Sequence, residues 1–252
     1  RSTSFARAQT MAARLFGELG QPDQGLALLE RLGQGRSRPG RTAPRAAAKR
    51  PSAALLATRA RLLEKLGRAP EARALLDGAL AQEPDDTDLW YERADLEQRL
   101  GNQQQAVDFL APLLHKDPDN VMALNFIGYS FAERGVNLRE AGELLRRAVD
   151  LAPDDGFVLD SLGWLLFREG KVAEALRTLA RADRLAPHSA EILFHVGEVK
   201  LAQGDKVGAK AAFEQALAVH PDDAHMTERL RDRMRALGAA VRVSNRHQGT
   251  KK

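Results

Sequence analysis

Five prolines recur along the chain at a nearly constant interval, and this interval limits the possible folds more than any other feature. Pro84, Pro118, Pro153, Pro187 and Pro221 are separated by 34, 35, 34 and 34 residues. Because proline cannot continue a helix, each of them is predicted to close a helical segment. A fixed period of roughly 20–50 residues is typical of a stacked array of repeats. The sequence therefore predicts a solenoid in which one unit is written five times.

Glycines show how each unit is built. Gly135 and Gly170 lie midway through their units, where a left-handed C-cap would end a first helix. Gly128 and Gly163 lie inside that helix, where glycine costs ~1 kcal/mol relative to alanine. We infer that these two glycines let a second helix come close, with a small alanine opposite. Each unit is therefore predicted to be a helix, a tight turn and an antiparallel helix, stable only when stacked on its neighbours.

The pattern resembles the tetratricopeptide repeat, a unit of about 34 residues with Leu-Gly, Tyr, Ala, Phe, Ala and Pro at fixed offsets. The resemblance implies an all-α fold, a right-handed α-solenoid of antiparallel helix pairs, in which the first helix of each pair lines a concave groove. Aromatic residues make up only 5% of the chain, and the composition rich in Ala, Leu, Arg and Glu agrees with an all-helical fold.

The repeat register predicts how the chain is divided. Residues 1–32 form a degenerate helix pair, which we expect to be cut from a longer array. Residues 33–52 contain three Pro and six Lys or Arg, and are interpreted as a basic linker. The five units are predicted at 53–86, 87–120, 121–155, 156–189 and 190–223. A capping helix is predicted at 224–238 and a disordered basic tail at 239–252.

Charge is distributed unevenly along the chain. Residues 1–65 hold 13 Lys or Arg and 4 Asp or Glu, and residues 229–252 hold 8 and 1. The part between them holds 17 basic and 29 acidic residues, so the repeats lack the continuous basic face that tracks a nucleic-acid backbone. We expect protein partners instead. The alternative is that the basic linker and tail bind an anionic surface, either nucleic acid or a membrane.

No residue pattern in the chain points to catalysis. There is no cysteine, so disulfides and cysteine-based metal sites are excluded. The six histidines lack the spacing of a metal site, such as His-Glu-x-x-His. Aspartates that follow the helix-ending prolines, such as Asp154 and Asp155, are interpreted as N-caps of the next helix. We therefore expect no enzyme activity, no cofactor and no metal.

The start of the chain bears on its location. It begins with Arg1, and residues 1–16 have neither a signal-type apolar core nor a membrane span. We expect a piece of a longer or processed protein. The predicted location is the bacterial envelope, periplasmic or anchored to the outer membrane through a missing N-terminus, and the alternative is the cytoplasm.

The resemblance also implies which residues bind a partner. In this repeat, the groove is lined by positions two, five, six, nine, twelve and thirteen of each unit. Aromatic side chains gather at these positions, and such anchors contribute ~2 kcal/mol or more when they bury a partner side chain. The alternative is that several of them only pack between helices. The predicted groove residues are Tyr91, Asp95, Asn125, Phe126, Tyr129, Asp160, Trp164, Arg168, Phe194 and His195.

Some members of this repeat class are chaperone adaptors that hold a C-terminal carboxylate through Lys or Arg and Asn. The corresponding positions here do not supply that set, so a chaperone adaptor is not predicted. These positions are Ala57, Arg61, Glu92, Met122 and Phe126.

A closer resemblance covers residues 121–217. The phrases LNFIGYSFAERG and DSLGW are similar to the C-terminal repeats of large bacterial tetratricopeptide proteins. These include an outer-membrane lipoprotein that acts as adaptor for a periplasmic carboxyl-terminal processing protease. The resemblance implies a scaffold that binds a protease and presents substrates to it. A third possibility is a regulatory region of a larger enzyme.

Overall fold

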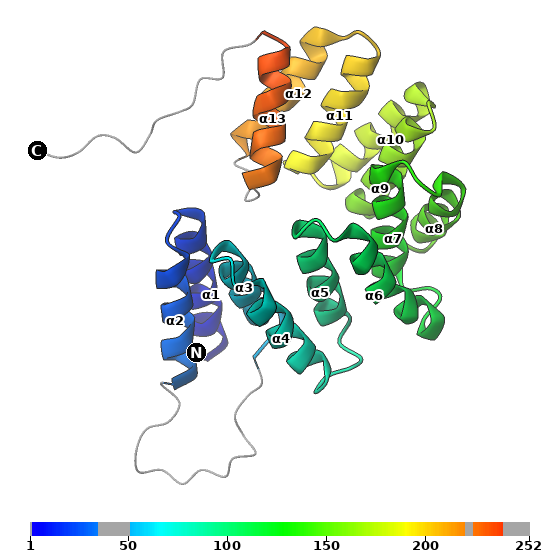
Figure 1. Cartoon of the computed structure of the whole chain (residues 1–252). Coiled ribbons are helices and arrows are strands. Elements are labelled where there is room, and N and C mark those ends of the chain that lie inside the picture. The colour runs from blue at the N-terminus through cyan, green and yellow to red at the C-terminus, as the bar shows by residue number, and fades with distance from the viewer. Residues whose placement is uncertain (1, 35–50, 220–223, 239–252) are drawn as a thin grey trace, which may run out of the picture. The chain divides into compact units, whose positions relative to one another are not determined.

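The computed structural model describes residues 2–34, 51–219 and 224–238 (Figure 1). Within these ranges all regular structure is helical, which confirms the predicted all-α class. Most of the predicted linker, residues 35–50, and the predicted tail, residues 239–252, lie outside the described residues. The helix before this linker continues through Gln34, two residues further than predicted.

The helices form two compact units, residues 1–112 and 113–252, and each is described by itself. The division falls inside the predicted repeat 87–120, within the helix that contains Pro112. Proline inside a helix removes one backbone hydrogen bond, so this helix is locally weakened where the units divide.

Unit 1 consists of successive antiparallel helix pairs. The buried side chains of α3, α4 and α5 form one apolar cluster, to which Leu26 of α2 and Phe109 of α6 also contribute. Each pair thus shares its core with the next first helix. The helices are α1 (Ser2–Glu18), α2 (Pro22–Gln34), α3 (Ala53–Lys65), α4 (Ala69–Leu80), α5 (Thr87–Arg99) and α6 (Gln103–Lys116), whose last turn belongs to unit 2.

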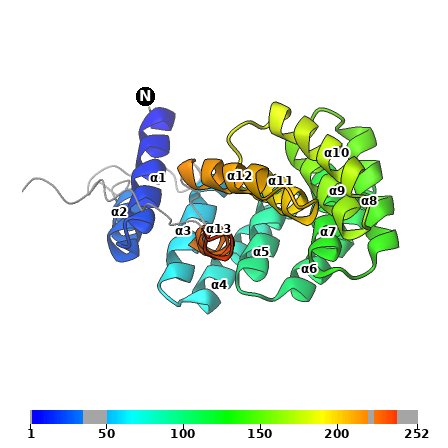
Figure 2. The ribbon, with the colours of Figure 1, turned by 90° about the horizontal axis from the view of Figure 1, so that it is seen from above.

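Unit 2 repeats this arrangement (Figure 2). Leu159 of α9 packs with Ala182 of α10 and Ile192 of α11, and Leu124, Ala148 and Val158 form the same cluster one repeat earlier. The helices are α7 (Val121–Arg134), α8 (Leu138–Leu151), α9 (Gly156–Arg168), α10 (Val172–Leu185), α11 (Ala190–Ala202), α12 (Lys206–Ala218) and α13 (Ala224–Ala236).

Local signals set the helix ends. The Asp155 carboxylate accepts hydrogen bonds from the backbone N–H groups of Phe157 and Val158, at 2.8 and 3.2 Å, and so caps α9. Its neighbour Asp154 instead accepts a hydrogen bond from Arg181 at 3.2 Å, so only one aspartate of this pair is an N-cap. Gly135 ends α7 in the left-handed region, at φ 69°.

The two helices of a pair meet at the glycine inside the first helix. A Cβ atom on Gly163 would lie 2.7 Å from Leu179 Cγ, and one on Gly128 would lie 2.6 Å from Leu145 Cγ. Both leucines are fully buried. The inference of close approach is therefore confirmed. The nearest side chain opposite is leucine, and the expected alanine lies beside it at Gly128, where a Cβ would be 3.3 Å from the Ala141 carbonyl oxygen.

We expect Gly163→Ala to destabilise unit 2 by roughly 1–3 kcal/mol, because the added methyl group overpacks the buried Leu179. Gly78→Ala in α4 is the matched control, since a Cβ there meets nothing within 4 Å. The control should stabilise its unit by roughly 0.4–1 kcal/mol. Denaturant unfolding measures both changes, and stabilisation by Gly163→Ala would contradict the tight contact.

One buried carboxylate joins the helices of unit 1. Glu97 of α5 accepts both guanidinium hydrogen bonds of Arg73 in α4, at 2.7 and 2.8 Å. It also accepts hydrogen bonds from Arg93 at 2.5 Å and from Asn102 at 2.8 Å. Only 3% of the Glu97 surface is exposed. The hydrogen bonds from Arg73 lead the interactions that lower the Glu97 pKa to about 2.

We expect Glu97→Gln to destabilise unit 1 by roughly 2–3 kcal/mol at neutral pH, since it leaves Arg73 and Arg93 without their shared carboxylate. The lowered pKa means that this contribution is present above pH 4.5 and is lost as the pH falls towards 2. Glu71→Gln, which breaks an exposed pair with Arg68, is the control and should have little effect. If urea unfolding shows that Glu97→Gln and Glu71→Gln lose equal amounts of unfolding free energy, a special role for Glu97 is refuted.

Candidate functional site

The first helices of successive pairs contact one another: α3 contacts α5, α7 contacts α9, and α9 contacts α11. Their residues at repeat positions two, five, six, nine and thirteen are here called the inner face, counted from residues 53, 87, 121, 156 and 190. The predicted groove residues all lie at these positions. The two units differ sharply in the chemistry of this face.

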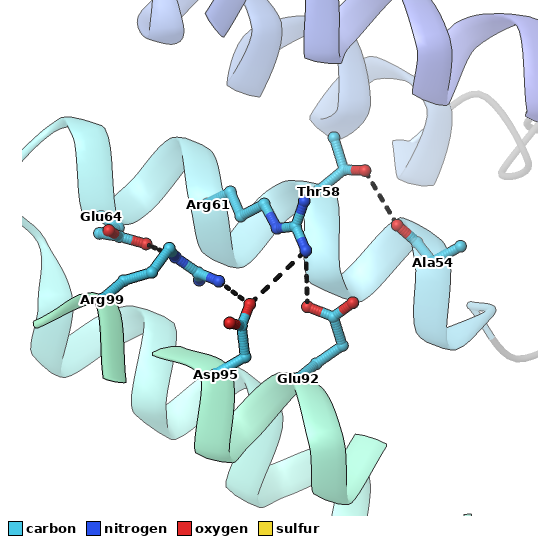
Figure 3. Close-up of polar contacts among 7 residues, drawn as sticks. All are labelled: Ala54, Thr58, Arg61, Glu64, Glu92, Asp95 and Arg99. Atoms are coloured by element: carbon cyan, nitrogen blue, oxygen red, sulfur yellow. Dashed lines mark hydrogen bonds and ion pairs between the residues drawn. The ribbon is translucent and has the colours of Figure 1, made fainter. Parts of the chain in front are cut away.

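In unit 1 the inner face is a network of ion pairs (Figure 3). Arg61 of α3 lies between two carboxylates of α5, with its Nη2 atom 3.4 Å from Glu92 Oε2 and 3.6 Å from Asp95 Oδ2. Arg99 pairs with Asp95 and, at 2.8 Å, with Glu64 Oε2. Each of these charges therefore already has a partner inside the unit.

The predicted residues of unit 1 have different environments. Tyr91 is 38% exposed, whereas the Asp95 side chain is 18% exposed and belongs to the ion-pair network. Burial raises the pKa of the neighbouring Glu92 carboxyl, although the charge of Arg61 acts in the opposite direction. Tyr91 is thus the large side chain that unit 1 presents at this face.

In unit 2 the inner face is built around a buried histidine. His195 of α11 is fully buried, and its Nδ1 atom lies 2.9 Å from both carboxylate oxygens of Asp160 in α9. The imidazole also stacks on the Trp164 ring, with 4.3 Å between centroids and 20° between planes. The Tyr129 ring of α7 lies 6.0 Å away. Three helices thus bring four predicted residues together, and Glu191 completes what is here called the His195 cluster: Tyr129, Asp160, Trp164, Glu191 and His195.

Helix α13 contributes to the same face. The Arg229 guanidinium lies over the Phe194 ring, 4.3 Å from its centroid, and 3.3 Å from Glu133 Oε1 of α7. The helix is held in place by Met226, Leu230 and Met234, which are buried against α11 and α12. Sequence reasoning predicted a cap here and missed Arg229.

A signal for Arg229 was present in the repeat register. If α13 is counted from residue 224 as the first helix of a sixth unit, Arg229 occupies position six, the position of His195 in the unit before. Each contacts position five of the preceding first helix: Arg229 lies over Phe194, and His195 binds Asp160. Helix α13 therefore continues the inner face.

Four buried polar atoms of this face have no hydrogen-bond partner among the described residues: Asn125 Oδ1, Glu133 Oε2, Trp164 Nε1 and His195 Nε2. An unpaired buried polar group costs about 1–3 kcal/mol, so a cluster of four needs water or a ligand to compensate. The other tryptophan does not share this feature, since Trp90 Nε1 donates to the Pro84 carbonyl at 2.9 Å. The inner face of unit 1 has one such atom, Arg61 Nε, whereas that of unit 2 has four.

The electrostatics of this face favour bound protons. Burial lowers the pKa of His195, but the charges of Asp160, Glu191 and Glu133 outweigh it and raise the pKa above its ordinary value. Burial raises the pKa of the Glu191 carboxyl, and burial together with the nearby carboxylates holds the Tyr129 pKa well above 10. The excess of carboxylates makes this face electronegative.

The remaining predicted residues lie around the cluster. Phe126 is 7% exposed and Phe194 is 1% exposed, so both rings pack mainly between helices, as the Trp164 ring does at 4% exposure. Arg168 is exposed, with its guanidinium against Gly135 at the C-terminal end of α7. Phe157, at position two of α9, is 56% exposed.

The Asp160–His195 pair invites comparison with catalytic dyads. A hydrolytic triad would need a nucleophile that donates to the second imidazole nitrogen, and His195 Nε2 accepts no such hydrogen bond from a described residue. The adjacent Ser161 hydroxyl donates to the Phe157 carbonyl at 3.1 Å. Within the described ranges there is also no cluster of three potential metal ligands. The arrangement can orient and bind polar groups.

The fold and this face define a repeat protein of stacked helix pairs. A family model of the tetratricopeptide repeat matches residues 63–125 and 166–229. The chain therefore belongs to the tetratricopeptide repeat family, whose members are generally protein-interaction scaffolds. Among residues 2–34, 51–219 and 224–238, no helix has the length and apolarity needed to cross a bilayer.

Two relatives share the repeats over part of their length. A TPR repeat-containing protein of Pseudomonas aeruginosa is 40% identical over 126 residues, which are 50% of this chain and 21% of that protein. Tetratricopeptide repeat protein 13 of Homo sapiens is 27% identical over 124 residues, which are 48% of this chain and 14% of the human protein. The match thus spans less than a quarter of either relative.

Solved structures share the fold. A tetratricopeptide repeat protein from Parabacteroides merdae has a TM-score of 0.64 and 21% identity, covering 90% of this chain and 83% of its own. A thermophilic TPR protein of Thermus thermophilus has a TM-score of 0.59 and 21% identity, and the match covers 73% of this chain and 99% of that protein's chain. At this identity the likeness establishes the solenoid fold alone.

We expect unit 2 to lose stability as the pH rises above 6.5. The pKa values of His195 and Glu191 are both raised on folding, so the folded unit binds more protons than the unfolded chain. The stabilisation that His195 contributes is fully present below pH 6.5 and is lost as the pH rises through the pKa of His195 in the folded unit. Thermal unfolding at a series of pH values measures it.

Two variants sharpen this test. His195→Asn, whose amide can still donate to Asp160, should remove most of the pH dependence above pH 6.5. His188→Asn is the control, because His188 is exposed and its positive φ of 65° suits asparagine. Wild-type stability that increases as the pH rises above 6.5 would contradict the assignment.

Proposed function

We propose that this chain is a non-catalytic interaction scaffold that binds a partner polypeptide on the inner face of unit 2. The proposal rests on the buried, unpaired polar atoms of Asn125, Glu133, Trp164 and His195. A polypeptide backbone carries both donors and acceptors, so it can pair with donors and acceptors of this face together. The exposed Phe157 ring offers an apolar anchor beside them.

The inner face of unit 1 has a smaller part in this proposal. Its guanidinium and carboxylate groups already pair with one another, so a charged partner would have to displace an existing ion pair. Tyr91 would supply an aromatic contact there. We therefore assign affinity mainly to unit 2 and treat Tyr91 and Asp95 as supporting residues.

We further propose that the scaffold works in the bacterial envelope, where it would bring a processing protease together with its substrates. The support is the resemblance of residues 121–217 to bacterial lipoprotein adaptors, and the 40% identity to a Pseudomonas aeruginosa repeat protein is consistent with a bacterial source. The alternative of an anionic-surface binder depends on the basic segments, which lie mainly outside the described residues. No described contact favours it or a regulatory role in a larger enzyme.

Site-specific photo-crosslinking in intact bacterial cells tests the proposal. A benzoylphenylalanine at position 157, on the inner face, should crosslink to partner polypeptides. The matched control is position 207 on α12, a second helix, where Val207 is 83% exposed. Identification of the crosslinked product by mass spectrometry then names the partner, and an envelope protease or its substrate is expected.

Two outcomes would count against the proposal. Equal crosslinking from positions 157 and 207 would show that the inner face is not the binding surface. Crosslinks from position 157 only to cytoplasmic proteins would retain the scaffold and refute the envelope role. Binding of the chain without crosslinking, compared at low and high salt, tests the anionic-surface alternative, because counterion-driven binding falls steeply with ionic strength.

A further inference from the structure

Two of the unpaired atoms of unit 2 are acceptors, Asn125 Oδ1 and Glu133 Oε2, and Trp164 Nε1 is a donor. Because Nδ1 of His195 faces a carboxylate, a proton lies there, and Nε2 accepts a hydrogen bond in the neutral imidazole and donates one in the protonated form. The two acceptors require a ligand that carries hydrogen-bond donors.

The charges of the face point the same way. Three carboxylates interact electrostatically there, those of Glu133, Asp160 and Glu191. Arg229 pairs with Glu133, and His195 binds Asp160. Glu191 receives a hydrogen bond from Tyr129 but has no ion pair within the described residues. Glu191 is thus the carboxyl group of this face with which a cation from outside can pair.

The unit already shows how it accommodates such a cation. The Arg229 guanidinium lies over the Phe194 ring and beside the Glu133 carboxylate, at 4.3 and 3.3 Å. Tyr129 and Glu191 offer the same combination of aromatic ring and carboxylate. Both are only half-buried, so a side chain can reach them from solvent. A guanidinium has five donors in a plane that stacks on aromatic rings.

We propose that the inner face of unit 2 recognises a basic side chain of its partner, arginine above all, which pairs with Glu191 and lies against Tyr129. This inference rests on the proposed function and adds the chemistry of the bound segment. The buried, unpaired Trp164 Nε1 and His195 Nε2 atoms distinguish the face from a solvated acidic patch, because a charged surface needs no unpaired buried atoms.

The two tryptophans allow a direct test in solution. The probe is N-acetyl-arginine methylamide, added to the ¹⁵N-labelled chain while the indole N–H resonances are followed by NMR. The Trp164 resonance should shift and saturate, while the Trp90 indole, already paired with Pro84, serves as the internal control. N-acetyl-glutamate methylamide should leave both unchanged.

Charge variants then locate the contact. Glu191→Gln should weaken binding of the arginine probe by about tenfold or more, as expected for the loss of one charge-assisted hydrogen bond. Glu143→Gln on α8 removes an equal charge from an exposed site of the same unit and should leave the affinity unchanged. Native positions of both indole resonances in the free variant establish that it is folded, and Tyr129→Leu provides a second variant that should also weaken binding.

The outcomes separate this inference from the proposed function. An unmoved Trp164 resonance, a larger shift with the glutamate probe, or equal losses in Glu191→Gln and Glu143→Gln would overturn recognition of a basic side chain. If position 157 still crosslinks to a polypeptide in that case, the scaffold stands and only its preference for a basic residue fails.

Discussion

The contact between a glycine of each first helix and a large side chain of its second helix governs unit 2. Leu145 and Leu179 occupy the space left by Gly128 and Gly163, and Phe213 occupies that left by Gly197. The two helices of a pair are thereby drawn close, and the next first helix packs against both. The first helices consequently lie near enough for Asp160 and His195 to bond across them.

This regular backbone carries two different faces. In unit 1, arginines and carboxylates on neighbouring first helices neutralise one another, which ties the helices together. In unit 2, position nine is aromatic in α7 and α9, so ion pairs give way to ring stacking around an imidazole. Stability and recognition thus depend on the same positions of the repeat, and the side chains placed there decide which of the two prevails.

The sequence predicted the helix pairs well because their signals are local and repeated. A proline that cannot continue a helix and a glycine that adopts positive φ act within one turn of their own positions. The inner-face positions followed from counting within each unit, and this placed Tyr129, Asp160, Trp164 and His195 together. Their burial could not be predicted, because it depends on how closely neighbouring helices approach.

Other features of the structure could not be predicted from the sequence, for related reasons. The alanine expected opposite Gly128 is present at Ala141, but the sequence does not show that Leu145 and Leu179 fill the space beside Gly128 and Gly163. Arg229 was assigned to a cap because its helix lacks a second partner helix within the predicted repeats. Its place on the inner face depends on contacts with α7 and α11, which are far from it in sequence.

The contribution of α13 to the inner face affects how such an array can grow. A terminal helix that only shielded apolar surface could be moved outward whenever a repeat was duplicated, leaving the existing surface as it was. Here a duplication ahead of α13 would carry Arg229 away from Phe194 and Glu133 and place another side chain over them. Lengthening this solenoid and changing what it recognises are therefore a single evolutionary step.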